Sequence, residues 1–324
     1  MNHESIGKEL DVINHELDAI YSDLTSTALS HEDGQEITAA SIVMTSAQSL
    51  PRINVYENIP FAGGDGDYSI LSVLFGAHSI GEGIFGYLNM IDSNKVRVQC
   101  VECRDAVMDF QWMDAESHIK GSVKAWRAAF PCARAVNVSY RYDIVDDADF
   151  VHIRGDARVR LHTVDMAHCY NVTDAAFTYL RGIHTLDMSW CREITDAAFV
   201  HLRGIHTLDM SFCNQDTITD AAFVNLRGIH TLNMSYCQQD TITDAAFVNL
   251  RGIHTLDMNH CDQISDAAFV NLRGIHTLDM SYCNQNTITG STFTHLRGIR
   301  DLKVVGCSAT VKAAAAALLA LPAL

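Results

Sequence analysis

The chain has 324 residues, of which 48% are hydrophobic and 19% charged, so it is long enough for two domains with sizeable cores. Its formal net charge of −16 repels phosphate backbones, and we therefore do not expect nucleic acid as a partner. The sequence has no run of about 18 uncharged apolar residues, which excludes an ordinary membrane-spanning helix.

The first residues bear on the cellular compartment. They read Met1-Asn2-His3-Glu4 and lack the basic and then apolar layout of a secretory signal peptide. We therefore expect an intracellular protein, in the cytoplasm or the nucleus, whose ten cysteines are reduced.

Residues 4–24 have the spacing of an amphipathic helix. Apolar residues recur in steps of four and three, as in a coiled-coil seam: Ile6, Leu10, Ile13, Leu17, Ile20 and Leu24. Two interpretations remain open, a helix that packs on its own protein and a short coil that forms a homo-oligomer. Residues 25–67 are rich in Ser, Thr, Asp and Gly, which is typical of a linker. The predicted N-terminal region, 1–67, holds 12 acidic and 2 basic residues, a net charge of −10.

Residues 68–132 return to a helical pattern and carry a motif. It reads Ile84-Phe85-Gly86-Tyr87-Leu88 and continues through Asp92 to a second apolar stretch that contains Cys100. This motif resembles the F-box, which reads Ile-Phe-x-Tyr-Leu, then an aspartate, then a helix with a cysteine. The resemblance implies a small α-helical module that docks an Skp-type adaptor of a ubiquitin ligase. The implied adaptor contacts are Ile84, Phe85, Tyr87, Leu88 and Val98.

Two features depart from the F-box pattern. The Leu-Pro pair that usually opens the motif is absent, and Cys103 stands where the family has a tryptophan. A plain helical cap for the region that follows therefore remains the alternative. Cys100 and Cys103 have the spacing of half a zinc site, but no second such pair follows, so we predict buried thiols and no metal.

The region from residue 133 onward is repetitive. The segment Ile-His-Thr-Leu followed by Asp or Asn, then Met, starts at Ile183, Ile205, Ile229, Ile253 and Ile275, and six repeat cysteines follow one another at steps of 22, 22, 24, 24 and 22 residues. A fixed period of this length predicts a solenoid. Residues 133–155 are a degenerate first copy, so the predicted solenoid covers 133–307. Residues 308–324 are rich in Ala and Leu and predict a helix that closes its far end.

One copy, residues 183–204, shows how a repeat is expected to fold. Leu186 alternates with polar residues, which predicts a short strand with one buried face. Cys191 ends the strand, where its thiol can meet backbone groups of the turn. Thr195 supplies the N-cap of a helix over 197–202, and a glycine after the helix tolerates the positive φ of its C-terminal end.

The template Leu-x-x-Leu-x-Leu-x-x-Cys-x-x-Ile-Thr-Asp resembles the cysteine-containing leucine-rich repeats over residues 161–307. The resemblance implies an α/β fold, a right-handed solenoid with parallel strands on its concave side and short helices on its convex side. This subclass is known chiefly from F-box proteins, so the two resemblances support each other. Near-identical copies also resemble repeat families of large DNA viruses of amoebae, which would place the protein in a host cytoplasm.

The concave side of such an arc is its usual binding surface. Columns of Thr, Asp and Ser are expected to point there, and the Asp column comprises Asp165, Asp187, Asp209, Asn233, Asp257 and Asp279. The residues before the cysteines add an aromatic edge, with Trp190, Phe212, Tyr236 and Tyr282 as the predicted contacts. We predict a groove for a basic or polar protein segment, with specificity in the aromatic column. The alternative is a solvated ladder of Asp side chains bonded to neighbouring Thr and Ser.

A histidine precedes each strand, at positions 162, 184, 206, 230, 254 and 276. We predict a solvated, acid-sensitive ladder and no metal site. No catalytic motif is present, so we expect neither an enzyme nor a cofactor. The main hypothesis is a substrate receptor of a cullin-type ubiquitin ligase. The alternative is a scaffold repeat protein that self-associates through residues 4–24.

Overall fold

The computed structural model describes residues 90, 93, 101–142, 144–154 and 159–321. The chain forms two compact units, Met1–Phe110 and Gln111–Leu324, and each is described by itself. In the first unit, helix α6 (Val101–Asp109) buries Val107. The predicted N-terminal helix, the linker and the five predicted adaptor contacts lie outside the described residues, and the predicted domain boundaries remain predictions.

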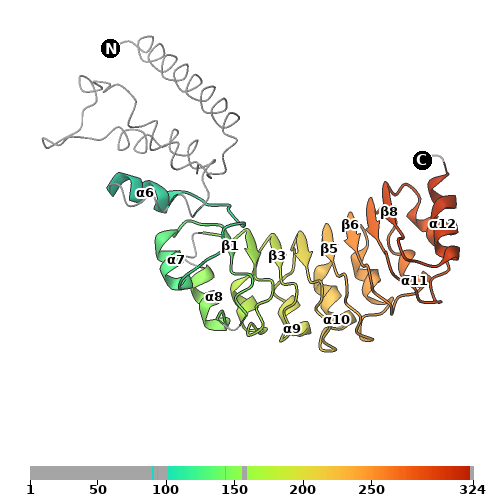
Figure 1. The fold of residues 1–324 in the computed structure, drawn as a ribbon, viewed down its shortest axis with the longest axis horizontal. Coiled ribbons are helices and arrows are strands. Elements are labelled where there is room, and N and C mark those ends of the chain that lie inside the picture. The colour runs from blue at the N-terminus through green and yellow to red at the C-terminus, as the bar shows by residue number, and fades with distance from the viewer. Residues whose placement is uncertain (1–89, 91–92, 94–100, 143, 155–158, 322–324) are drawn as a thin grey trace, which may run out of the picture. The chain divides into compact units, whose positions relative to one another are not determined.

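The second unit is built on one sheet of eight parallel strands, whose order in the sheet is their order in the chain (Figure 1). Each strand has three residues: β1 (Ala135–Asn137), β2 (Thr163–Asp165), β3 (Thr185–Asp187), β4 (Thr207–Asp209), β5 (Thr231–Asn233), β6 (Thr255–Asp257), β7 (Thr277–Asp279) and β8 (Asp301–Lys303). Neighbouring strands pair in register, so Leu186 lies beside Leu208. Equivalent residues of successive repeats therefore form continuous columns. Within this unit the strands line the concave side and the short helices lie on the convex side.

Alternation within each strand separates the core from the concave surface. In β3 the central Leu186 is buried, while Thr185 and Asp187 are half-buried. Met188 and Phe199 of the same repeat are fully buried beneath the sheet. Strands of three residues are too short to be stable alone, so the stacking of apolar columns stabilises the sheet.

The repeat cysteines are buried free thiols that bond to the backbone of the preceding repeat. Cys213 Sγ, for example, donates to the carbonyl oxygen of Met188 at 3.3 Å. The predicted contact between these thiols and the backbone is confirmed. Burial raises the pKa of Cys283 to about 12, so this thiol is a structural group with little thiolate character.

The convex elements are shorter than predicted. They are the single-turn helices α9 (Asp196–Phe199), α10 (Asp220–Phe223) and α11 (Asp266–Phe269) and the 3₁₀ segments η1 (Ala176–Tyr179), η2 (Val224–Leu226), η3 (Ala246–Leu250) and η4 (Phe293–Leu296). The predicted N-cap is confirmed, because Thr195 Oγ1 accepts the Ala197 N–H at 3.2 Å. The predicted helix over 197–202 ends at Phe199 because the chain tightens into three-residue bonds, such as Leu202 N–H to Phe199 O at 3.0 Å.

Polar side chains tie neighbouring repeats together on the convex side, which we did not predict from the sequence. The two carboxylate oxygens of Asp196 accept the N–H and the hydroxyl of Thr219 in the next repeat, at 2.8 and 2.7 Å. The same clasp joins Asp147 to Thr173, Asp174 to Thr195, Asp220 to Thr243, Asp244 to Ser265 and Asp266 to Thr289. Each repeat is thereby bonded to the next through a charged acceptor.

The two extra residues of the longer repeats also have a structural role. Their loops carry Gln215, Gln239 and Gln285, whose side-chain amides each donate to a cysteine carbonyl of the preceding repeat at 3.0 Å. The longer loops therefore satisfy buried backbone acceptors without shifting the strand register.

Helices close both ends of the second unit. At the start, α7 (Val123–Ala129) and α8 (Asp147–Arg154) surround Arg127, whose guanidinium donates to the carbonyl oxygens of Phe130, Ala133 and Ile153. Burial lowers the pKa of Arg127 to about 10. At the far end, the predicted closing helix is confirmed as α12 (Ala309–Leu319), with Val311 buried. In the part of the chain described, no helix has the length and apolarity needed to cross a bilayer.

Candidate binding face

The predicted acidic positions form one row on the concave side, called the Asp row below. It comprises Asp165, Asp187, Asp209, Asn233, Asp257 and Asp279, which close the successive strands β2 to β7. All six side chains are half-buried. Because the strands pair in register, neighbouring members lie about 5 Å apart. The structure thus brings together every predicted member.

Each side chain of the Asp row caps the end of its strand. Asp187 Oδ1 accepts the Ser189 N–H at 2.9 Å, and Asn233 Oδ1 accepts the Ser235 N–H at 3.0 Å. The cap therefore needs an oxygen and does not need a charge. It also turns the chain inward, so Ser189 is only 8% exposed and Ser211 only 7%. The prediction that the serine column faces the concave solvent is wrong for this reason.

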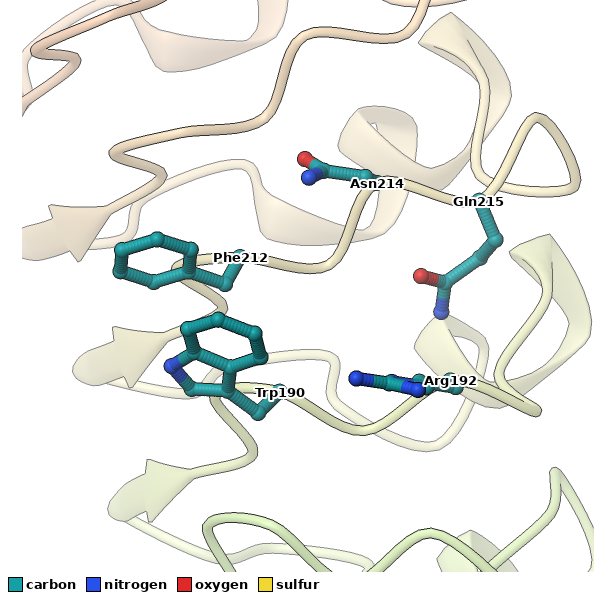
Figure 2. Close-up of a pocket in the computed structure, with 5 residues that line it drawn as sticks. All are labelled: Trp190, Arg192, Phe212, Asn214 and Gln215. Atoms are coloured by element: carbon teal, nitrogen blue, oxygen red, sulfur yellow. The ribbon is translucent and has the colours of Figure 1, made fainter.

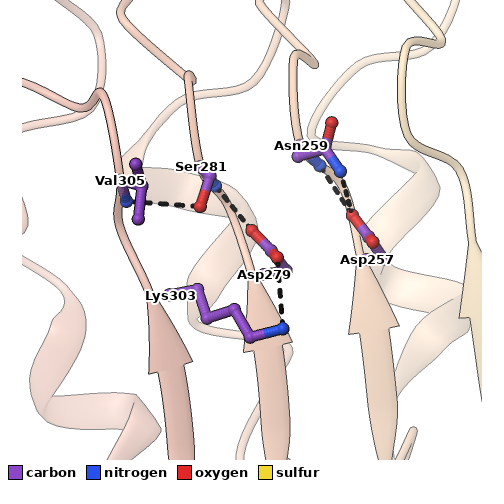
Figure 3. Close-up of polar contacts among 6 residues, drawn as sticks. All are labelled: Asp257, Asn259, Asp279, Ser281, Lys303 and Val305. Carbon is purple, nitrogen blue, oxygen red and sulfur yellow. Dashed lines mark hydrogen bonds and ion pairs between the residues drawn. The ribbon is translucent and has the colours of Figure 1, made fainter.

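The charges at both ends of the Asp row have partners. Asn137 Nδ2 donates to Asp165 Oδ2 at 2.9 Å. At the far end, Lys303 Nζ lies 3.6 Å from Asp279 Oδ2 (Figure 3). Lys303 occupies the last position of the same column, so the chain itself shows a cation pairing with this row.

The charge of Asp187, the second member of the row, is less well compensated. Asn233 Nδ2 donates to Asp209 Oδ2 at 2.7 Å, but among the described residues Asp187 has neither a side-chain amide donor nor a cation beside it. Burial, and then the charges of Asp209 and Asp165, raise the pKa of Asp187 to about 6, although hydrogen bonds from Ser189 oppose this shift. Burial also raises the pKa of Asp257. This part of the face holds poorly solvated negative charge, which favours a basic group.

The residues before the cysteines form a continuous stack of rings, called the aromatic ladder below. It comprises Tyr140, His168, Trp190, Phe212, Tyr236, His260 and Tyr282, and adjacent ring centroids are 4.2 to 5.2 Å apart. All seven have φ between 57° and 62°, a left-handed conformation uncommon for residues other than glycine. Ring stacking and a backbone bond to the next repeat, such as Trp190 N–H to Ser211 O at 3.0 Å, support this conformation.

The stacking decides which part of each ring meets solvent. Inner rings present their edges, whereas the two end members are more open, with Tyr140 58% and Tyr282 48% exposed. The ladder ends because Gly306 takes the place of the next aromatic residue, and a Cβ there would lie 2.4 Å from the Tyr282 ring. Sequence alignment of the copies places Tyr140 in the column, but the left-handed backbone has no signal in the sequence.

A hollow of about 330 Å³ opens beside the aromatic ladder (Figure 2). Trp190 and Phe212 form one wall, and Arg192, Asn214 and Gln215 form the rest. The Arg192 guanidinium lies 4.6 Å from the ring centre of Tyr170, which holds it in place. The hollow therefore offers an aromatic wall and a cation, and we did not predict it from the sequence.

The six histidines that precede the strands also stack, with ring centroids 4.0 to 4.5 Å apart. In five of them Nδ1 lies 3.0 to 3.1 Å from the hydroxyl oxygen of the following threonine. Burial, and then the charges of neighbouring histidines, lower the pKa of His206 and of His254. The parallel rings do not converge on one point. Across the described residues, no group of three or more His, Cys, Asp or Glu side chains is placed to hold a metal ion.

We expect the free energy of unfolding to fall as the pH is lowered from about 7.5 to 5.5 because of this histidine stack. The folded pKa values of His206 and His254 lie below the unfolded value, so below about pH 6.5 the unfolded chain binds more protons. Urea unfolding at several pH values measures the slope of the free energy of unfolding against pH. The double variant His206→Gln and His254→Gln should have a shallower slope, and an equal slope in both proteins would contradict the expectation.

No protein-family model and no curated protein matches the sequence significantly. Solved structures do resemble the fold. A chain of the TLR13–ssRNA13 complex aligns with 63% of this chain at 17% identity and a TM-score of 0.50, and the match spans 30% of that longer chain. The complex of Rad7 and Elc1 in yeast gives 14% identity over 66% of this chain and 62% of the other, with a TM-score of 0.48.

A third similar structure is the mouse RP105/MD-1 complex, with 15% identity over 62% of this chain and 35% of the other and a TM-score of 0.47. These likenesses concern the fold alone. The likeness to the TLR13 chain, together with the eight in-register parallel strands and the short convex helices, confirms the predicted fold class. The chain is a leucine-rich-repeat solenoid.

Proposed function

We propose that the concave side of the solenoid binds a basic polypeptide segment, with the Asp row and the aromatic ladder as the contact surface. The observation that carries this proposal is the carboxylate of Asp187, the second member of the Asp row, which lies between Asp165 and Asp209 with no cation beside it among the described residues. Lys303 occupies the same column and pairs with Asp279, which gives a precedent for a basic side chain on this row. The edges of the adjacent rings offer apolar contact to the rest of the segment.

Asparagine substitutions in the Asp row test this proposal without altering the strand caps, because Asn233 already makes the same cap. A displayed library of random peptides would be selected on the full chain, and the enriched peptides measured by calorimetry. We expect enrichment of Lys and Arg, and about tenfold weaker binding to Asp187→Asn. The opposite variant, Asn233→Asp, should bind more tightly. Selected peptides without basic residues, or affinities unchanged by both variants, would overturn the proposal.

A more specific role follows from the F-box resemblance alone. We propose that the chain is a non-catalytic substrate receptor of a cullin-type ubiquitin ligase, in which residues 84–98 dock an Skp-type adaptor and the concave side holds the target. Binding of purified adaptor to the full chain tests this role, with Phe85→Ala and Tyr87→Ala as the variants expected to lose it. An adaptor that does not bind the wild-type chain would leave the alternative, a scaffold protein without a ubiquitin role, which the missing Leu-Pro pair and Cys103 favour.

A further inference from the structure

An apolar stripe runs along the convex side over the four middle repeats. Val200, Val224, Val248 and Val270 are 48%, 48%, 47% and 39% exposed. The alanine three residues before each valine is exposed as well. Thr178 and Thr294 take the valine position in the repeats on either side, so the stripe ends there. Exposed apolar residues that recur at the same position in four successive repeats are a candidate interaction surface.

Two charged rows flank this valine stripe. On one side lie Asp196, Asp220, Asp244 and Asp266, each four residues before its valine. On the other lie Arg203, Arg227, Arg251 and Arg273, each three residues after its valine and exposed. Among the residues the structure describes, ion pairs join Arg104 to Asp105 and Lys303 to Asp279, and none involves these two rows.

The arginines are held close to the stripe. Arg203 Nε donates to Asn225 Oδ1 at 2.9 Å, and Asn225 directly follows Val224 of the next repeat. Arg227 and Arg251 make the same bond to Asn249 and Asn271, at 2.9 and 3.1 Å. Each of these three guanidinium groups is therefore fixed beside an exposed valine, and among the described residues its other donors remain free for a partner.

The order of the three rows makes this surface complementary to itself. A two-fold axis parallel to the long direction of the solenoid would place the valine stripe on its own copy and each arginine row on an aspartate row. A two-fold axis across the solenoid would instead place arginine on arginine, which is repulsive. Convex surfaces meet only near their middle, and the four valines belong to the repeats of β3 to β6, the middle four of eight strands.

We infer that a second copy of this chain docks on the valine stripe, forming a parallel two-fold dimer through the convex sides. The contact between two curved surfaces is small, so we expect a weak dimer in equilibrium with the monomer. This surface lies on the opposite side from the proposed peptide-binding face. A failure of one proposal therefore leaves the other unaffected.

Sedimentation velocity of the full chain over about 1 to 100 μM tests the dimer. We expect a concentration-dependent monomer–dimer equilibrium for the wild type and monomer throughout for Val224→Asp with Val248→Asp. The matched control is Val151→Asp, which changes an equally placed and 50% exposed valine outside the stripe and should behave as wild type. Urea unfolding of each variant would show that the fold is retained. A wild type that stays monomeric, or a double variant that still dimerises, would overturn the inference.

Cysteine crosslinking tests the direction of the axis. In the parallel dimer Val224 faces its own copy and so does Val248, so Val224→Cys and Val248→Cys should each crosslink to themselves with a short bismaleimide. The wild type supplies the background of native cysteines. Crosslinks that form only in a mixture of the two variants would indicate the axis across the solenoid and contradict the proposed arrangement.

Discussion

Replacing Asp220 with alanine is expected to lower the free energy of unfolding by about 2–3 kcal/mol. Asp220 Oδ1 accepts the Thr243 N–H at 2.8 Å, and Oδ2 accepts the Thr243 hydroxyl at 2.7 Å. Both bonds are lost in the variant, together with a favourable negative charge at the start of α10. Because the contacts of a solenoid are between neighbours, the loss weakens the coupling of two middle repeats, and the urea transition should also broaden.

Two matched variants separate the clasp from a general effect of removing an acidic residue. Asp220→Asn keeps one acceptor for the Thr243 N–H and should lose about half as much stability. Asp216 is an exposed carboxylate in the loop before the same helix, and Asp216→Ala should change stability by less than about 0.5 kcal/mol. Urea unfolding followed by circular dichroism measures all three. Equal stabilities of Asp220→Ala and Asp216→Ala would show that the clasp contributes nothing.

Replacing Asp187 with asparagine is expected to raise the free energy of unfolding at pH 7 by about 1–3 kcal/mol. The pKa of Asp187 is raised from 3.8 to about 6, chiefly by burial, so the folded protein holds this charge at a cost. Asparagine removes the charge and keeps the oxygen that accepts the Ser189 N–H, as Asn233 does two strands away. The same variant is expected to bind a basic peptide more weakly. A gain in stability with a loss of binding would indicate that the charge serves recognition.

The stability gained by Asp187→Asn depends on pH because the pKa of Asp187 is raised in the folded protein. A raised folded pKa means that the penalty is full above about pH 6 and disappears as Asp187 takes up a proton, towards the unfolded value of 3.8. The advantage of Asp187→Asn should therefore shrink between pH 7 and pH 4. Asn233→Asp is the reverse control, since it removes the amide donor to Asp209 and should destabilise the protein at pH 7. Equal stability of wild type and Asp187→Asn at pH 7 would show that the charge of Asp187 does not destabilise the folded protein.

The candidate site could be predicted only in part. The copies align without ambiguity, so the members of the Asp row and of the aromatic ladder follow from the sequence, and in-register strands confirm that they stand in columns. The sequence could not predict which carboxylates of the row have a cation beside them, because Asp187 and Asp279 have the same kinds of neighbours within their repeats. They differ in the residue that lies beside them on the following strand. Asp187 lies beside Asp209, whereas Asp279 lies beside Lys303.

The sequence by itself determined the solenoid, its columns and its buried side chains, because the hydrophobic period of a repeat is a local property that each copy restates. Tertiary structure decided what lies between copies: the clasp from Asp196 to Thr219, the stacked rings with left-handed backbone, and the burial of the serines. It also placed the exposed valines between two charged rows. The clasp and the arginine bonds to the next repeat join residues more than 20 positions apart, and a period in the sequence does not specify those contacts.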